Sequence, residues 1–299
     1  MNEKAFVPEL VALLSRASIE IAAGHPRTMD TLHDQFDPGT EVFVNFTPSG
    51  DYPAVAETAA QLRRAGFNPV AHIAARGLAS AAALTDFLSR LSGEAGVDRV
   101  LLISGDRNPA LGPFNSSMDL LRTGLFEKHG VRFVGIAGQP EGHPKVASAV
   151  LDAALQEKCA HAVAAGLAPF IVTQFCFEAR PILEWLGRIR RAGIDAPVRL
   201  GVAGPATVAT LIKFGERCGV GDSLKAIRAR TNLAGGSLGI SGPEDLLRDL
   251  ATGLAAFPGH GVSGVHFFPF GGVAKTGDFI ARTLARLYGD ITPGGTVPA

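Results

Sequence analysis

The stretch "VRFVGIAGQPEGHPK", residues 131–145, decides how the chain folds. Its first half is a run of apolar and β-branched residues, which is typical of a buried strand. Its second half is an elbow, residues 138–144, in which glycine and proline alternate with polar side chains. Apolar residues at helical spacing follow over residues 145–165. The stretch therefore predicts a strand, a polar elbow and a helix in direct succession.

The same unit recurs along the chain. Eight strand-like runs occur, at residues 18–22, 41–46, 69–74, 99–104, 131–137, 169–175, 198–203 and 263–268. Strands that alternate with helices form parallel sheets through right-handed crossovers. Eight such units predict an α/β fold of the closed (β/α)8 TIM barrel type. A doubly wound open sheet is the alternative that this pattern also allows.

Amphipathic segments separate the strands, and several of them end near a glycine, as helices commonly do. They lie at residues 55–65, 79–91, 117–128, 145–165, 179–192 and 207–218. We expect an additional N-terminal helix within residues 1–16 and extra helices between the seventh and eighth strands, near 223–230 and 243–255. Residues 1–299 are interpreted as one barrel domain, and 289–299 as a loose tail rich in glycine, proline and threonine.

Composition excludes several classes of protein. The 299 residues are 46% hydrophobic and 19% charged, which suits a globular protein with a large core. Lys and Arg number 28, as do Asp and Glu, and the charges are scattered, which disfavours nucleic acid and membrane surfaces as partners. The three cysteines lack metal-binding spacing, and no secretion leader or membrane span is recognisable, so we expect a cytoplasmic protein. The oligomeric state is not indicated.

Polar residues near the ends of the strands are the candidates for chemistry, because active sites of such barrels lie at the carboxyl ends of the strands. Glu20 lies inside the first strand between Ile19 and Ile21, and we expect it to point inward, because helices cover the outer face. Burial would raise the pKa of its carboxyl group toward the range that suits a general acid. Asn45 ends the second strand, and His72 in the third is either a core residue or a ligand contact.

Ser104, Gly105 and Asp106 leave the fourth strand. Asp106 is either the cap of a turn or an acceptor for the N–H groups of a flat ligand, which Gly105 would allow to approach closely. In the elbow, His143 lies between Gly142 and Pro144, where it has little to pack against. A helix beginning near Lys145 would present free N–H groups to an anion at the same place.

Gln174 closes the sixth strand, where a buried amide needs several hydrogen-bonding partners that a heterocycle could supply. The neighbouring Cys176 is interpreted as a small buried hydrophobic residue rather than a nucleophile. No short-spaced histidine pair, nucleophile elbow or phosphate-binding glycine motif occurs, so we expect no metal site. No strand ends in the lysine that a Schiff-base aldolase would require.

These residues lie in motifs that resemble the methylenetetrahydrofolate reductase family. The motifs are "IEI" around Glu20, "ISGDRNP" around Asp106, "GIAGQPEGHP" before Lys145, "IVTQFCFE" around Gln174 and "GVHFFPF" at the last strand. The resemblance runs from about Ser18 to Phe268. It implies a barrel that carries FAD at the carboxyl ends of its strands, with NAD(P)H as the hydride donor. It also implies hydride transfer that interconverts 5,10-methylenetetrahydrofolate and 5-methyltetrahydrofolate.

The resemblance also assigns roles by position. It implies that Glu20 is the general acid, that Asp106 is the carboxylate near the pterin and the flavin, and that Gln174 reads the pterin edge. The positions implied for FAD binding are Asn45, His72, Ser104, Gly105, Gln139, His143, Asp152 and Lys158.

The chain departs from the family where FAD would be held. Ser104 replaces an arginine, and Gln139 replaces an aromatic residue. Leu155 replaces an asparagine. Of two basic residues that the family has on the same helix, this chain keeps one, Lys158, and has Cys159 in place of the other. Because fewer cations are present, we expect weaker binding of the FAD diphosphate. The direction of the reaction stays open, including oxidation in demethylation metabolism, and the alternative is a tetrahydrofolate-binding barrel without redox activity.

Overall fold

A computed structural model describes residues 6–24, 27–45, 52–144, 146–220 and 240–291. Eight strands form a closed barrel in the order β1-β10-β7-β6-β5-β4-β3-β2. The strands are β1 (Ser18–Ala22), β2 (Glu41–Asn45), β3 (Asn68–Ala74), β4 (Arg99–Ile103), β5 (Phe133–Gly138), β6 (Ala168–Thr173), β7 (Val198–Ala203) and β10 (Val262–Phe268). Each coincides with an expected run, so the TIM barrel is confirmed and the open sheet is excluded.

The chain divides into two compact units. The β1–β6 unit comprises Ser18–Gly138 and Ala149–Val172, and the β7–β10 unit comprises Met1–Ala17, Gln139–Ser148 and Thr173–Ala299. The units are described separately below.

Parallel strand pairs form the interior of the β1–β6 unit. Phe43 of β2 lies opposite Glu20 of β1 and Val70 of β3 in register. Phe43, Val70, Leu101 and Val172 form one buried cluster, against which Ile103 and Phe170 pack. Gly135 of β5 faces the same cluster, because a Cβ atom there would lie 2.7 Å from Cζ of Phe170 and 2.9 Å from Cδ1 of Leu101. The missing side chain at residue 135 makes room for the phenyl ring.

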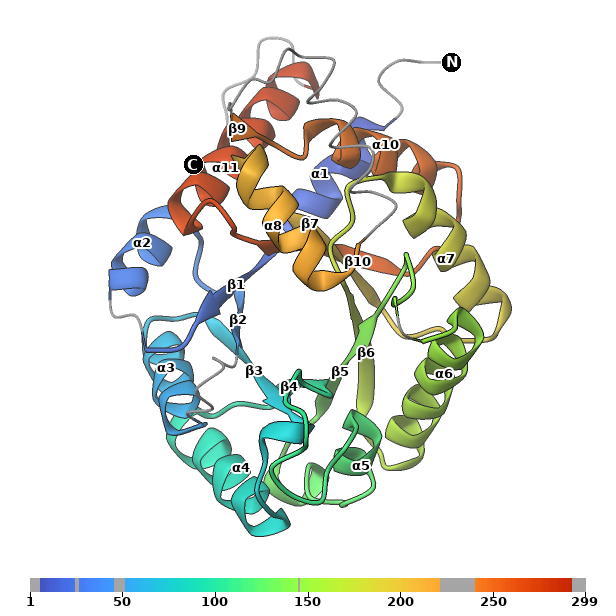
Figure 1. Cartoon of the computed structure of the whole chain (residues 1–299). Helices are drawn as coiled ribbons and strands as arrows, with labels where there is room; N and C mark the ends of the chain where they lie inside the picture. Colours follow the sequence, from blue (N-terminus) through green and yellow to red (C-terminus); the bar gives the residue numbers. More distant parts are fainter. Residues whose placement is uncertain (1–5, 25–26, 46–51, 145, 221–239, 292–299) are drawn as a thin grey trace. The chain divides into compact units, whose positions relative to one another are not determined.

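Helices α2 (Arg27–Gln35), α3 (Tyr52–Arg64), α4 (Ala81–Ala95), α5 (Ser117–Leu121) and α6 (Ser148–Ala164) follow these strands. In Figure 1, α3 and α4 lie outside strands β2 to β4. Helix α2 was not expected. The helix predicted over 117–128 is shorter, because Gly124 adopts a left-handed conformation (φ 61°) and a separate 3-10 turn, Glu127–His129, follows. Helix α6 begins at Ser148 instead of near Lys145, because His143 pairs with Val146 in a β-bridge.

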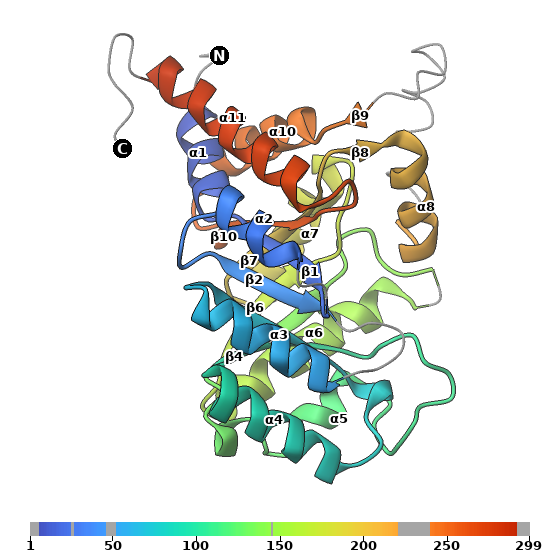
Figure 2. The same ribbon diagram turned by 90° about the vertical axis from the view of Figure 1, so that its left-hand side faces the viewer.

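The β7–β10 unit consists of two parallel barrel strands and a layer of helices. Its helices are α1 (Val7–Ser15), α7 (Ala179–Arg191), α8 (Val208–Cys218), α10 (Glu244–Ala255) and α11 (Val273–Ile291). In Figure 2, α1 lies beside α10 and α11. Helix α10 packs closely on α7, because a Cβ atom at Gly253 would lie 2.3 Å from Cδ1 of Leu183. A short antiparallel pair, β8 (Ala206–Thr207) with β9 (Ile240–Ser241), was not expected.

The extra helices expected before β10 and the tail expected after α11 both belong to this unit. The extra helix near 243–255 is confirmed by α10, whereas the one near 223–230 lies outside the described residues. The prediction of a loose tail from residue 289 is wrong at its start, because α11 continues to Ile291. Gly289 does not adopt the left-handed conformation that commonly ends a helix, and α11 continues through it.

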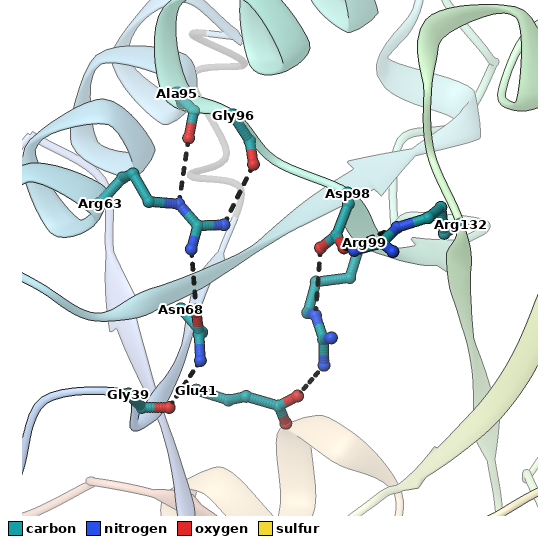
Figure 3. Close-up of polar contacts among 9 residues, drawn as sticks. All are labelled: Gly39, Glu41, Arg63, Asn68, Ala95, Gly96, Asp98, Arg99 and Arg132. Atoms are coloured by element: carbon teal, nitrogen blue, oxygen red, sulfur yellow. Dashed lines mark hydrogen bonds and ion pairs between the residues drawn. The ribbon is translucent and has the colours of Figure 1, made fainter.

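An ionic network lies where β2, β3 and β4 begin, in the β1–β6 unit (Figure 3). Arg99 pairs with Glu41 and with Asp98, and Nε of Arg132 donates a 3.1 Å hydrogen bond to the same aspartate. Burial works to raise the pKa of Asp98, but the hydrogen bond from Arg132 and the two guanidinium charges outweigh it and hold that pKa below its usual range.

Arg63 joins the ends of neighbouring elements in the same region (Figure 3). Its guanidinium donates to Oδ1 of Asn68 at 2.9 Å and to the carbonyl oxygen of Gly96 at 3.1 Å. The side chain of Asn68 in turn donates to the carbonyl oxygen of Gly39 at 2.7 Å. Because polar residues at the amino-terminal side of barrel strands serve mainly stability, we interpret both sets of contacts as structural. No helix in the described parts of the chain combines the length and apolar character needed to cross a bilayer.

Candidate active site

Three polar side chains on adjacent strands meet inside the β1–β6 unit. Nδ2 of Asn45, the last residue of β2, donates a hydrogen bond of 2.8 Å to Oε1 of Glu20 on β1. Nε2 of His72 on β3 lies 3.5 Å from Oε2 of the same carboxyl group. The side chains of Glu20 and His72 are only 14% and 7% exposed. Glu20 therefore points inward, as expected, and both of its oxygens face polar groups.

The inward direction follows from strand geometry. Glu20 lies opposite Phe43 in the strand register, and Phe43 belongs to the buried cluster of the interior. Asn45 is two residues beyond Phe43, so alternation places it on the same face of the sheet. The ring of Phe43 also meets the imidazole of His72 edge-on, with centroids 6.0 Å apart. A carboxyl group held between an amide donor and an imidazole, against an aromatic ring, is suited to holding and delivering a proton.

The segment after β4 contributes the next candidates. Ser104 is fixed by its backbone, because its carbonyl oxygen accepts a 2.9 Å hydrogen bond from Arg76 N–H. Gly105 has φ of 84°, and a Cβ atom there would lie 3.1 Å from Cβ of Ala74 at the end of β3. Asp106 is exposed, and within the described residues its side chain makes no hydrogen bond or ion pair. The carboxylate of Asp106 therefore caps no turn there and is open to a ligand.

One supporting residue was missed by sequence reasoning. The hydroxyl group of Tyr52 on α3 donates a 2.8 Å hydrogen bond to the carbonyl oxygen of Ala74, next to Gly105. Burial raises the pKa of Tyr52, and the hydrogen bond to Ala74 offsets only part of that effect, so the hydroxyl group stays protonated as a donor. No sequence signal indicates this role, because a tyrosine in an amphipathic helix is ordinarily a packing residue.

Helix α6 holds two further candidates, Asp152 and Lys158, which are both half-buried. Burial lowers the pKa of Lys158, and the neighbouring Cys159 and Glu157 partly offset this effect. Leu155 and Cys159, one helical turn apart, are 4% and 8% exposed and belong to the core. Two positions at which the resemblance implies polar residues, 155 and 159, are therefore buried and apolar on this side of α6.

The β7–β10 unit contains the elbow from Gln139 onward. Gly142 N–H donates a 3.0 Å hydrogen bond to the carbonyl oxygen of Gln139, and Gly142 has φ of 80°, so residues 139–142 form a tight turn. His143 follows with an exposed side chain. The amide oxygen Oε1 of Gln139 is buried and accepts no hydrogen bond from any residue that the structure describes.

Two contacts hold the elbow in place within this unit. Cys176 is completely buried and contacts Glu141. Burial is the main cause that raises the pKa of the Cys176 thiol well above its usual range, and the charge of Glu141 is the second. The burial of Cys176 agrees with its interpretation as a small buried residue. Pro144 packs on the end of α8, because a Cβ atom at Gly219 would lie 2.8 Å from Cδ of Pro144.

Gln174 lies one residue beyond the end of β6 and is half-buried. Its Oε1 accepts a 3.1 Å hydrogen bond from Phe175 N–H, which orients the side chain. The predicted residues thus fall into two sets. In the β1–β6 unit Glu20 contacts both Asn45 and His72, and Ser104–Asp106 follow the adjacent strand. Gln139, His143 and Gln174 belong to the β7–β10 unit. Within the described residues, no group of histidine, cysteine, aspartate and glutamate side chains is arranged to hold a metal ion.

Fold and site together define a (β/α)8 barrel protein with a largely buried carboxyl group, that of Glu20, within its first strand. The methylenetetrahydrofolate reductase family model matches residues 39–221, more than half of the chain, and the chain belongs to that family. Methylenetetrahydrofolate reductase 2 of Saccharomyces cerevisiae is 28% identical over 127 residues, which cover 40% of this chain and 21% of the yeast protein. The chain thus matches only about a fifth of that relative's length. A solved structure of dihydropteroate synthase from Thermus thermophilus aligns with a TM-score of 0.47 and 14% identity, covering 91% of this chain and 95% of that chain.

Proposed function

We propose that this protein is a folate oxidoreductase that interconverts 5,10-methylenetetrahydrofolate and 5-methyltetrahydrofolate. Family membership supports folate chemistry, and the observation that carries the specific reaction is the contact of Asn45 and His72 with the carboxyl group of Glu20. The chemistry requires one proton and one hydride at different atoms of the folate, and a largely buried carboxyl group is a suitable proton donor. The three cysteines form no disulfide in the residues that the structure describes, which fits a reducing cytoplasm as the compartment.

Glu20 acts as the general acid in this proposal. The methylene group of methylenetetrahydrofolate bridges two nitrogens, and Glu20 delivers its proton to the one outside the pterin ring. The bond between that nitrogen and the methylene carbon then breaks. The other nitrogen, in the pterin ring, forms an iminium ion with the methylene group. A hydride added to the iminium carbon gives the methyl group. In the oxidative direction the same steps reverse, and Glu20 accepts the proton.

Asp106 stabilises the cation that forms in this step. Its exposed carboxylate makes no hydrogen bond or ion pair with the described residues, so its charge is available to a bound iminium ion. Gln174 recognises the edge of the pterin ring. The hydrogen bond from Phe175 to its Oε1 leaves the amide N–H groups as donors for the ring.

FAD is the cofactor that the family implies, and when bound it carries the hydride between a nicotinamide and the folate. Two separate features support a flavin ring as the ligand: in the β7–β10 unit the buried Oε1 of Gln139 lacks a partner among the described residues, and in the β1–β6 unit Gly105 lets a flat ligand approach the backbone. Asn45, His72, Ser104, His143 and Asp152 are the further contacts we propose. Lys158 is the cation for the diphosphate. The buried Leu155 and Cys159 bring no positive charge to this side of α6, so we expect weak binding of the diphosphate.

The same apolar side of α6 favours a second candidate function, a tetrahydrofolate-binding barrel without redox activity. The two functions differ in whether the purified protein retains flavin, which absorbs near ~450 nm. The test is an assay of both directions with FAD and with either NADH or NADPH. Turnover in one direction supports the oxidoreductase. Binding of 5-methyltetrahydrofolate without turnover in either direction supports the binding protein.

A further inference from the structure

The side chain of Gln139 has a hydrogen-bonding capacity that the fold does not use. Its Oε1 is buried, and no described residue donates to it, whereas its backbone oxygen accepts from Gly142 N–H at 3.0 Å. A buried amide oxygen without a partner is costly, and most such atoms in folded proteins are satisfied. An unsatisfied acceptor in a native fold therefore indicates a donor that binds from outside the chain.

The local structure fixes the backbone that carries the Gln139 side chain. The tight turn fixes its backbone, with Pro140 at the second position and a left-handed Gly142 at the fourth. The following residues are anchored, Glu141 by contact with the buried Cys176 and Pro144 by packing on Gly219. The backbone at Gln139 is thus ordered before any ligand arrives, and such preorganisation lowers the cost of binding.

We propose that Oε1 of Gln139 accepts a hydrogen bond from a ring N–H of a flat heterocyclic ligand, and that it selects for ligands with an amide-like ring N–H. This inference rests on the proposed function, which offers two sources of that chemistry. The flavin ring carries an imide N–H between two carbonyl groups, and the pterin ring carries an N–H beside one carbonyl group. Gln139 is in this respect a specificity-determining residue, because a ligand without the donor leaves the buried oxygen unsatisfied.

The first part of the test measures binding by titration of the whole protein with FAD and, separately, with 5-methyltetrahydrofolate. Gln139→Met keeps the length of the side chain and removes the acceptor. We expect about a tenfold or greater loss of affinity for the ligand that supplies the donor, and little change for the other. The partly exposed, helical Gln61→Met is the matched control and should bind both ligands as the wild type does.

An analogue of FAD methylated at the imide nitrogen then tests the donor if FAD is the affected ligand. The methyl group should weaken binding to the wild type and have a much smaller effect in Gln139→Met, because the two changes remove the same hydrogen bond. Equal losses in both proteins would contradict the assignment to this atom.

The second part of the test measures thermal unfolding without ligand. Gln139→Met should unfold at the same or a higher temperature than the wild type, because it removes an unsatisfied acceptor, while Gln61→Met should be unchanged. A lower unfolding temperature for Gln139→Met alone would show that an ordered water satisfies the oxygen, and would overturn the inference. Unaltered affinity of Gln139→Met for both ligands would also overturn it. A wild-type protein that binds neither ligand would contradict the proposed function as well.

Discussion

Oε1 of Glu20 and Nδ2 of Asn45 are joined by a 2.8 Å hydrogen bond between two neighbouring barrel strands. The bond orients the carboxyl group so that its second oxygen faces His72 at 3.5 Å. Three residues that are far apart in the sequence thereby form one acid site. The position of the proton on this carboxyl group is the property on which the proposed reaction depends.

Replacement of this acid should affect the reaction and not the fold. Glu20→Gln keeps the size of the side chain and an oxygen that accepts from Asn45, but it has no proton to deliver. We expect turnover with methylenetetrahydrofolate to fall by about 10²-fold or more, since general acid catalysis contributes 10²–10⁴. Circular dichroism and the unfolding temperature should stay unchanged. Glu94→Gln, at an exposed position on α4, is the control, and wild-type turnover in Glu20→Gln would remove this residue from the mechanism.

Asp106 should matter for one half of the reaction. Asp106→Ala removes a charge that would stabilise a cationic folate, so we expect stopped-flow measurements to show a slower folate step and nearly normal reduction of FAD by the nicotinamide. Asp106→Asn should give an intermediate effect, because it keeps an oxygen acceptor without the charge. If both half-reactions slowed equally, the residue would have a structural role instead.

The network around Asp98 should make the fold sensitive to acid. The pKa of Asp98 is below its usual value, so its ion pairs contribute stability that is present above the unfolded-state pKa of about 3.9. That stability is lost as the pH falls through the lower, folded-state pKa. Urea unfolding of Asp98→Asn should show lower stability at pH 7 and a smaller loss between about pH 4 and pH 2. The same acid dependence in both proteins would contradict this assignment.

Packing at Gly135 should be intolerant of a side chain. Gly135→Val places atoms within 3 Å of Phe170 and Leu101, and we expect a loss of about 1–3 kcal/mol in the free energy of unfolding from overpacking. Gly93→Ala on α4 is the matched control, because no atom lies within 4 Å of its added Cβ and the helix favours alanine. Urea unfolding should show a neutral or stabilising effect for this control, and an equally neutral Gly135→Val would refute the packing argument.

The cysteines should differ in reactivity. Burial and the charge of Glu141 raise the pKa of Cys176, so this thiol should react with a disulfide reagent at pH 8 only when the protein unfolds. Cys218 is partly exposed and should react faster in the folded state. Rates measured in Cys176→Ala and Cys218→Ala separate the two thiols. Fast labelling of Cys176 in the folded protein would contradict its placement.

Much of the architecture follows from local sequence patterns. The strand runs and the amphipathic segments between them predict the barrel because side-chain alternation and helical periodicity are local properties. The predicted ends of three helices differ from those in the structure. Gly124 ends α5 early, the His143–Val146 bridge delays the start of α6, and α11 extends past Gly289 because that glycine does not adopt a left-handed conformation. The polar helix α2 has too few apolar residues to be recognised by periodicity.

The sequence by itself identified Glu20, Asn45 and His72 as polar residues near strand ends, together with the family to which the chain belongs. Only the tertiary structure decided that Asn45 and His72 both contact Glu20, that Tyr52 supports the end of β3, and that Oε1 of Gln139 is buried without a partner among the described residues. The physical reason is that hydrogen bonding and burial depend on which strands lie side by side in register. That arrangement brings together residues that are distant in the sequence, so no local pattern records it.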